Sequence, residues 1–237
     1  LVQSEIRAGR GPVWLDCKDF SDSVWAEFEA SQGDAVLSKI SAAGSDYRTE
    51  KIEVVPAAHS VLAGLVIDQQ AATNLSGLFA AGENVTGIHG AGRLSGNGLT
   101  ACVVMGRVAG KNASDTAKTC TRPDAAPPVL AAADRLDATR RKTLIDQMRE
   151  AAGHGLGIIR NQSAIAEARL VFAAIVNRLS PSCPLHPADH DILQMGILGQ
   201  LMCDAAARRP ESRGVQCRED ATDTDIHWTK WQIVTQS

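Results

Sequence analysis

The chain has 237 residues, of which 44% are apolar and 22% are charged, and its formal net charge is −3. This length predicts one or two domains with an ordinary core, and the charge favours neither nucleic acid nor a membrane surface as a partner. No apolar run approaches the ~20 residues of a membrane span, and the first residues lack a signal-peptide pattern. We therefore expect no membrane span in this chain and a cytoplasmic location.

The cysteines do not form a pattern typical of metal sites. Six are scattered along the chain without a C-x-x-C pair, and no histidine lies beside one at ligand spacing. In a chain of this size they are expected to be reduced thiols in the core or on the surface. We therefore predict that no metal is bound.

The first 59 residues predict short elements. Residues 1–16 have the pattern of a helix end, a turn and a short strand, and residues 19–43 that of one helix with an interrupted apolar face. Residues 52–56 (IEVVP) predict a short strand that stops at a proline. His59 follows in an apolar stretch, where an isolated histidine is usually a core residue with satisfied hydrogen bonds.

Residues 77–98 are the most informative part of the chain. The segment 77–83 (GLFAAGE) predicts a short apolar strand that ends at Gly82 and the acid Glu83, and the segment 89–98 (HGAGRLSGNG) predicts a tight loop that opens a helix over residues 99–113. Such an arrangement suits a nucleotide cofactor. The acid lies at the end of the strand, the glycines let the backbone approach the ligand closely, and the helix N-terminus presents unpaired N–H groups to it. Glycine density alone is equally typical of a simple turn, so from these residues alone both interpretations stay open.

The second half of the chain predicts helices. Residues 112–128 are rich in Ala, Ser, Thr, Asp and Pro and have the composition of a linker. Apolar residues at helical spacing then predict three helices, over residues 129–150, 162–179 and 190–208.

These motifs occur in the order of a known family. Residues 77–110 closely resemble the second FAD-binding segment of the succinate dehydrogenase/fumarate reductase flavoprotein family, from which Gly92, Ser95 and Gly98 are departures. Residues 5–16 resemble the end of that family's substrate-capping domain, and residues 57–68 resemble the segment where the chain re-enters the FAD domain. The tail, with ESRGVQCRED at 211–220, resembles the ending of the succinate/fumarate branch more than that of the related L-aspartate oxidases.

The resemblance implies an α+β fold made of a capping-domain remnant, an FAD-domain strand–loop–helix segment and a C-terminal helical bundle. A complete family member also has a strand–GxGxxG–helix unit that cradles the FAD pyrophosphate, and this sequence contains none. We therefore expect a fragment, a processed product or one chain of a split flavoprotein, with the N-terminal FAD-binding half missing. The implied parts are the end of the capping domain (1–56), the C-terminal segment of the FAD-binding domain (57–114), a linker (115–128), a helical domain (129–208) and a tail (209–237).

The resemblance also implies roles for single residues. Arg93 and His59 match the family's ligands of the substrate carboxylates and are the predicted catalytic residues. Glu83 matches the acid that lies against the ribose and ribityl part of FAD. The cofactor-binding set is completed by Gly82, Asn97, Gly98 and Leu99. Without the motif, Arg93 would be interpreted as a solvated or phosphate-facing loop residue, and Glu83 as a turn acid.

The implied reaction is hydride transfer between FAD and a C4 dicarboxylate, with succinate and fumarate interconverted. The alternatives are an L-aspartate oxidase, another dicarboxylate or enoate reductase, or a non-catalytic assembly component of a split flavoprotein. The implied partners are the C4 dicarboxylate, the missing FAD-binding half and an iron–sulfur electron-transfer protein, which could hold the chain at the periphery of the inner membrane. Residues 211–220 should return to the glycine-rich loop, with Arg213, Arg218 and Glu219 available to pair with it.

Overall fold

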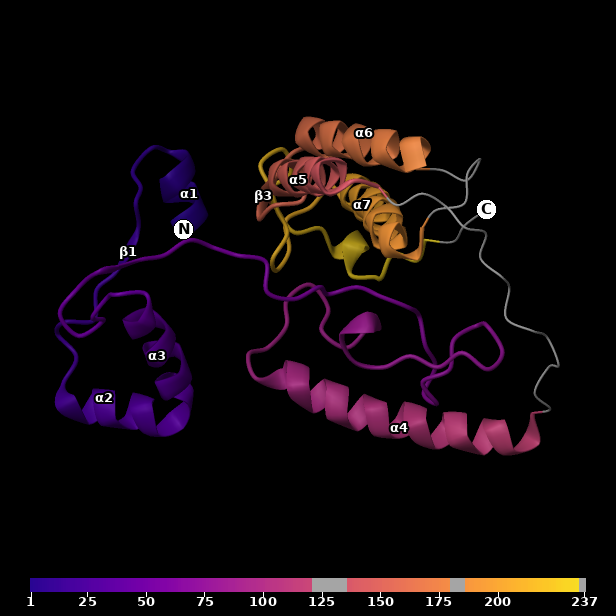
Figure 1. The fold of residues 1–237 in the computed structure, drawn as a ribbon, viewed down its shortest axis with the longest axis horizontal. Helices are drawn as coiled ribbons and strands as arrows, with labels where there is room; N and C mark the ends of the chain where they lie inside the picture. Colours follow the sequence, from indigo (N-terminus) through magenta and orange to yellow (C-terminus); the bar gives the residue numbers. More distant parts are fainter. Residues whose placement is uncertain (121–135, 180–185, 235–237) are drawn as a thin grey trace. The chain divides into compact units, whose positions relative to one another are not determined.

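The computed structural model describes residues 1–120, 136–179 and 186–234, and it is rich in helices with only small sheets. The chain divides into two compact units, Leu1–His59 and Ser60–Ser237, which are described separately (Figure 1). The predicted division into five parts has no direct counterpart in these two units and stays a prediction.

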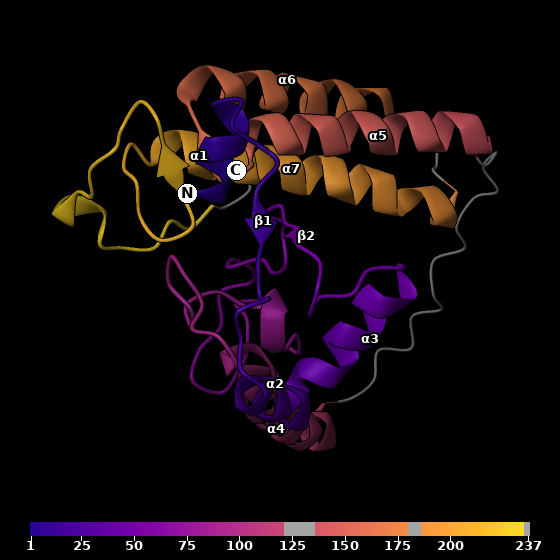
Figure 2. The same cartoon turned by 90° about the vertical axis from the view of Figure 1, so that its left-hand side faces the viewer.

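The first unit contains helices α1 (Val2–Arg7), α2 (Asp22–Phe28) and α3 (Asp34–Ala42) and strands β1 (Trp14–Leu15) and β2 (Ile52–Glu53). The two strands pair antiparallel, as Figure 2 shows. The predicted helix, turn and strand of residues 1–16 are therefore confirmed. Trp25 and Leu37 are buried in a small core with Cys17, and the Tyr47 ring lies 5.0 Å from that of Trp25 between centroids.

The helical pattern predicted over residues 19–43 is confirmed for residues 22–42. A π-helical turn over Glu29–Gly33 lies between α2 and α3. The Ser31 hydroxyl donates to the Phe28 carbonyl at 2.7 Å, and such a bond competes with the regular helical pattern. Gly33 in the same turn is a weak helix former. Helix α2 begins at Asp22 and not at residue 19, because the Ser21 side chain caps it by accepting from the Val24 amide.

The second unit begins with an irregular segment, residues 60–96. The strand predicted over residues 77–81 is wrong, because only Phe79 pairs there, with Ala72 in an isolated antiparallel bridge. The Ala80 amide donates to the Ala71 carbonyl at 3.0 Å, so the segment folds back on itself as a narrow hairpin. A 3₁₀ turn over Gly82–Asn84 follows.

Helix α4 (Asn97–Thr119) extends past the helix predicted over 99–113 and into the predicted linker. The linker prediction is wrong for residues up to 119, where polar side chains favour the helix. Asp115 accepts from Lys111 at 2.9 Å and from Lys118 at 2.8 Å, at the spacings that stabilise an exposed helix. Residues 121–128 of the predicted linker, which contain its three prolines, lie outside the described residues.

Helices α5 (Ala138–Gly155), α6 (Gln162–Leu179) and α7 (His190–Arg208) pack side by side, as Figures 1 and 2 show. The bounds of α6 and α7 are those predicted. Helix α5 starts at Ala138, where Asp137 caps it by accepting from the Arg140 amide, and residues 129–135 of the predicted helix lie outside the described residues. Their shared core is apolar and includes Leu144, Met148, Ile165, Phe172, Ile175, Ile192 and Cys203.

The tail is joined to this bundle by a two-stranded parallel sheet of β3 (Ile159–Arg160) and β4 (Cys217–Arg218). Arg218 is buried, donates to the Ala206 carbonyl at 2.9 Å at the end of α7, and forms a forked pair with Asp220.

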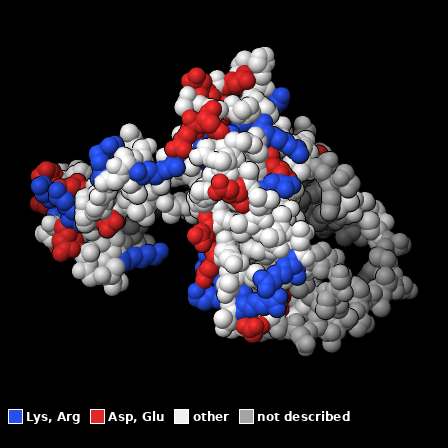
Figure 3. Space-filling model, turned by 90° about the horizontal axis from the view of Figure 1, so that it is seen from above, with Lys and Arg blue, Asp and Glu red and all other residues white. Residues whose placement is uncertain are grey.

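The surface of the described residues drawn in Figure 3 has acidic and basic side chains interspersed.

Candidate functional site

The start of α4 is open to a ligand. Gly96 precedes it with a φ of +80°, a conformation that favours glycine, and no side chain caps the helix. The first turn therefore presents amide groups and the positive end of the helix dipole, which together attract anions. Asn97, Gly98 and Leu99, three of the predicted cofactor-binding residues, form this turn, and Leu99 is 81% exposed.

Arg93 lies against the same helix start. A Cβ at position 98 would be only 2.9 Å from its Nη1 atom, so glycine at this position leaves room for the guanidinium. Arg93 is partly buried, and within the described part of the chain no carboxylate pairs with it. A guanidinium held in place without an internal counter-ion can bind a carboxylate through two parallel hydrogen bonds.

Gly82 and Glu83 lie beside α4. Gly82 has a φ of +79°, and a Cβ on it would be 3.2 Å from the Cys102 sulfur of the helix. Glu83 is exposed, and its Oε1 accepts from the Val61 amide at 2.8 Å. Its carboxylate is therefore held at the surface, where it can accept from further donors.

The segment that follows His59 runs next to this acid. The Leu65 amide donates to the Asn84 carbonyl at 2.8 Å, and a Cβ on Gly64 would overlap that carbonyl oxygen at 2.1 Å. Glycine is therefore required at position 64 for the close approach of two backbones. His59 itself is exposed and ends the first unit, so the structure brings together Arg93, Glu83 and the start of α4 but does not place His59 beside them.

The tail returns to the glycine-rich loop, as predicted. The Val215 amide donates to the Ala91 carbonyl at 2.9 Å, two residues before Arg93. At a second point, a Cβ on Gly87 would be 3.1 Å from the Trp231 ring. The tail therefore contacts the loop through backbone and through an aromatic ring.

The predicted mode of this contact is wrong for the two arginines, whose ion pairs lie within the tail. Arg213 pairs with Glu211, and Arg218 pairs with Asp220. These ion pairs stabilise the tail. Glu219 accepts from the Asn161 amide group at 3.3 Å.

Glu211 is the centre of that tail, and sequence reasoning did not single it out as a structural residue. Its side chain is fully buried and accepts two bonds from Arg213 at 2.9 Å, one from the Asp225 amide at 2.9 Å and one from Arg209. The hydrogen bonds from the Arg213 guanidinium, the Asp225 amide and Arg209 outweigh the opposing effect of burial and lower the pKa of Glu211 to about 2. The signal in the sequence is an acid with an arginine two residues away on either side.

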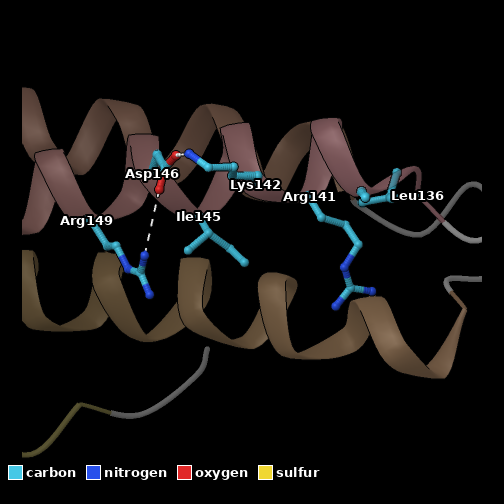
Figure 4. A pocket seen from close by; sticks show the side chains of 7 residues that line it. Leu136, Arg141, Lys142, Ile145, Asp146 and Arg149 are labelled. Carbon is cyan, nitrogen blue, oxygen red and sulfur yellow. Dashed lines mark hydrogen bonds and ion pairs between the residues drawn. The ribbon is translucent and has the colours of Figure 1, made fainter.

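A surface groove of about 550 Å³ lies along α5 (Figure 4). Its lining charges already have partners: Asp146 pairs with Lys142 and Arg149, and Arg141 with the buried Asp189. None of the predicted site residues lines it. We therefore interpret it as a groove of the helix surface.

Membrane spans and metal clusters are absent from the part of the chain that the structure describes. None of the helices there is both long and apolar enough to cross a bilayer. No group of three or more His, Cys, Asp or Glu side chains in these ranges is arranged to hold a metal ion. The cysteines described are all free thiols, of which Cys17 and Cys203 are buried.

Comparison with known proteins identifies the family of this chain. Residues 1–99 match the FAD binding domain family, and residues 190–237 match the family of the fumarate reductase flavoprotein C-terminus. Both families are parts of FAD-dependent oxidoreductases, which defines the class of protein that this chain matches. Within that class it belongs to the succinate dehydrogenase/fumarate reductase flavoprotein family.

Individual relatives agree with this assignment. The chain is 29% identical over 97% of its length to a fumarate reductase (CoM/CoB) chain of Methanothermobacter marburgensis, of which it covers 44%. It is 32% identical over 94% of its length to the L-aspartate oxidase of Caulobacter vibrioides, of which it covers 39%. It also resembles the structure of E. coli quinol fumarate reductase, with a TM-score of 0.73, 25% identity, and coverage of 96% of this chain and 43% of that one. The chain thus spans less than half the length of the proteins it matches.

The residues at the start of α4 fit the family's cofactor. FAD combines a phosphate-bearing chain, hydroxyl groups and a ring that gains negative charge on reduction. An exposed carboxylate suits hydroxyl groups, and an uncapped helix start suits negative charge. Glu83 and the first turn of α4 therefore have the chemistry, an acceptor and several donors, that would suit this part of the cofactor.

Proposed function

We propose that this chain forms the dicarboxylate-binding side of an FAD-dependent active site that interconverts succinate and fumarate. The observation that carries the proposal is Arg93, a partly buried guanidinium that lies on Gly98 at an uncapped helix start and has no carboxylate partner among the described residues. A dianionic substrate needs a fixed cation of this kind, because a carboxylate taken out of water must keep strong hydrogen bonds.

The chain's own residues would hold the substrate and the charge that develops. Arg93 binds one carboxylate through its planar fork, and His59 donates to the other. The start of α4 stabilises negative charge near Gly98 and Leu99, and Glu83 accepts from hydroxyl groups of the cofactor. FAD, when bound, supplies the group that accepts or gives the hydride.

Partner proteins belong to the same proposal. The Methanothermobacter relative is named as one subunit of a fumarate reductase, and the chain covers 44% of it. We therefore propose two partners, an N-terminal FAD-binding half and an iron–sulfur electron-transfer protein, with the complex in the cytoplasm or at the inner membrane. Residues 1–56 would be the end of the capping domain, 57–114 part of the FAD domain, and 129–208 the helical domain.

The second candidate is oxidation of L-aspartate. It is favoured by relatives named L-aspartate oxidase, one of which is 30% identical over 80% of this chain. L-Aspartate is also a C4 dicarboxylate, so Arg93 could bind it in the same way. The tail sequence after ESRG favours the succinate/fumarate branch. Turnover of fumarate and of L-aspartate by the same preparation separates the two candidates.

The test is Arg93→Lys in the flavin-loaded enzyme that contains this chain. Lysine keeps the charge but loses the fork, so we expect kcat/KM for fumarate to fall about 100-fold or more, which is about 2.7 kcal/mol of lost transition-state stabilisation. Flavin content should stay close to normal. Loss of flavin with unchanged activity per bound flavin would mean that Arg93 binds the cofactor and that the proposed role is wrong.

A further inference from the structure

The tail makes a tight turn whose tip touches the loop that carries Arg93. The Arg213 amide donates to the Gln216 carbonyl at 2.9 Å, and the Gln216 amide donates back to the Arg213 carbonyl at 3.1 Å. Gly214 has a φ of +59°, whereas Val215 is not among the described residues with positive φ. Positive φ at only the first central residue is typical of a type II′ hairpin turn, which favours glycine there.

The tip of this turn sits directly on the loop. A Cβ on Gly214 would lie 2.0 Å from the Ala91 carbonyl oxygen, a backbone atom that cannot rotate away, and a Cβ on Gly92 would lie 3.9 Å from the Gly214 Cα. The Val215 amide donates to the same Ala91 oxygen at 2.9 Å. The two loop residues that precede Arg93 are therefore held by the turn.

Glu211 fixes the turn in its place. Its carboxylate holds Arg213 at the base of the turn, and it also accepts from Arg209. Arg209 donates to the Trp228 carbonyl at 2.9 Å and to the Lys230 carbonyl at 2.7 Å, just before Trp231 reaches the loop at Gly87. One buried carboxylate therefore organises both points at which the tail touches the loop.

We infer that Gly214 is a positioning residue for substrate binding: the turn it forms seats on Ala91 and sets the direction in which Arg93 leaves the loop. This inference rests on the proposed role of Arg93. The tail itself touches neither substrate nor cofactor, and its effect on the reaction passes through the loop backbone. A displacement of about 1 Å in a substrate-orienting group is enough to reduce the rate greatly.

The experiment compares Gly214→Ala with Gly44→Ala in the flavin-loaded enzyme. Gly44 has a φ of +87° and no atom within 4 Å of an added Cβ, so its variant has a comparable backbone strain without the contact. We expect Gly214→Ala to raise KM for fumarate about tenfold or more with the same flavin content as Gly44→Ala, whose KM should change less than about twofold. Equal KM values for the two variants would overturn the inference.

Hydrogen exchange of the unmodified enzyme gives an independent test that does not require the variant to fold. With succinate added, peptides covering residues 87–95 and 212–217 should both become more protected, because substrate bound at Arg93 stabilises the seated turn. Protection of the loop peptide alone would overturn the inference. Arg93→Lys is measured in parallel: if it leaves kcat/KM for fumarate unchanged, the proposed function fails, whereas a lowered kcat/KM for Arg93→Lys with an unchanged KM for Gly214→Ala means that only the positioning role is wrong.

Discussion

Replacing Glu211 with glutamine tests how much the buried carboxylate stabilises the tail. Glutamine has nearly the same shape but no charge, and its amide group would place two donors against arginines that are themselves donors. Arg209 and Arg213 would then lose their shared counter-ion while their side chains stay 16% and 30% exposed. We therefore expect Glu211→Gln to destabilise the second unit.

The loss in the free energy of unfolding depends on the burial of the ion pair and on the hydrogen bonds that Arg209 and Arg213 keep in the variant. Breaking a buried ion pair from one side costs about 3–5 kcal/mol, because the remaining charge is left without compensation. Arg209 keeps its bonds to the Trp228 and Lys230 carbonyls, and Arg213 keeps its bond to the Asp225 carbonyl at 3.0 Å. These bonds place the expected loss in the free energy of unfolding near the lower limit, about 3 kcal/mol, which corresponds to a Tm lower by about 6–12 °C for a unit of this size.

The difference in the free energy of unfolding between the wild type and Glu211→Gln should also depend on pH. The pKa of Glu211 is lowered from 4.5 to about 2 in the folded chain, so the folded state binds its proton more weakly than the unfolded state does. The stabilisation is therefore complete above about pH 4.5 and is lost as the pH falls towards 2. Wild type and Glu211→Gln should differ most at neutral pH and converge below pH 4.5.

The assay is urea unfolding of the 237-residue chain followed by tryptophan fluorescence at pH 7 and at pH 3. Glu167→Gln is the matched control, because Glu167 is 66% exposed and pairs with His154 at 3.0 Å on the helix surface. An exposed pair of this kind contributes less than about 1 kcal/mol. Equal losses in the two variants, or a loss for Glu211→Gln that is the same at both pH values, would refute the argument.

Two further outcomes are expected. Gly199→Ala should lower the free energy of unfolding by about 1–3 kcal/mol in urea titrations, because its Cβ would come within 2.5 Å of the Phe172 ring. Gly106→Ala is the control: an added Cβ there has no atom within 4 Å, so this variant should be neutral or stabilising by up to about 1 kcal/mol. The 237-residue chain alone should lose added FAD on dialysis, because one helix start and Glu83 cannot offset the cost of immobilising the cofactor. Yellow protein with stoichiometric flavin after dialysis would contradict this second expectation.

The sequence predicted the helices of the bundle better than any other part of the fold. Helices α6 and α7 have the predicted bounds because their apolar residues recur at helical spacing and face one shared core. The end of α4 was not predicted, because its last turns contain polar residues that also occur in linkers. Their ion pairs on Asp115 become visible only when the helix is formed.

The candidate site was predicted by resemblance more than by pattern. Glycines and an acid next to a helix suit a cofactor or a turn equally well, and the order of the residues around Arg93 decided between them. Glu83, Arg93 and Gly98 do lie around the start of α4, but their chemical roles stay predictions. The seating of Gly214 on Ala91 could not be predicted, because it joins residues more than a hundred positions apart and depends on the shape of a turn.

The composition of the loop explains why such a distant contact would be useful. Residues 86–96 include four glycines, which allow close approach to a ligand but lose more conformational entropy on ordering than any other residue. Ordering a residue costs about 1–2 kcal/mol, so a loop of this kind would weaken substrate binding if the substrate had to order it. Contacts at Gly87 and Ala91 order the loop before any ligand arrives. In this interpretation the buried Glu211 contributes to substrate affinity without contacting the substrate, because it holds the tail that holds the loop.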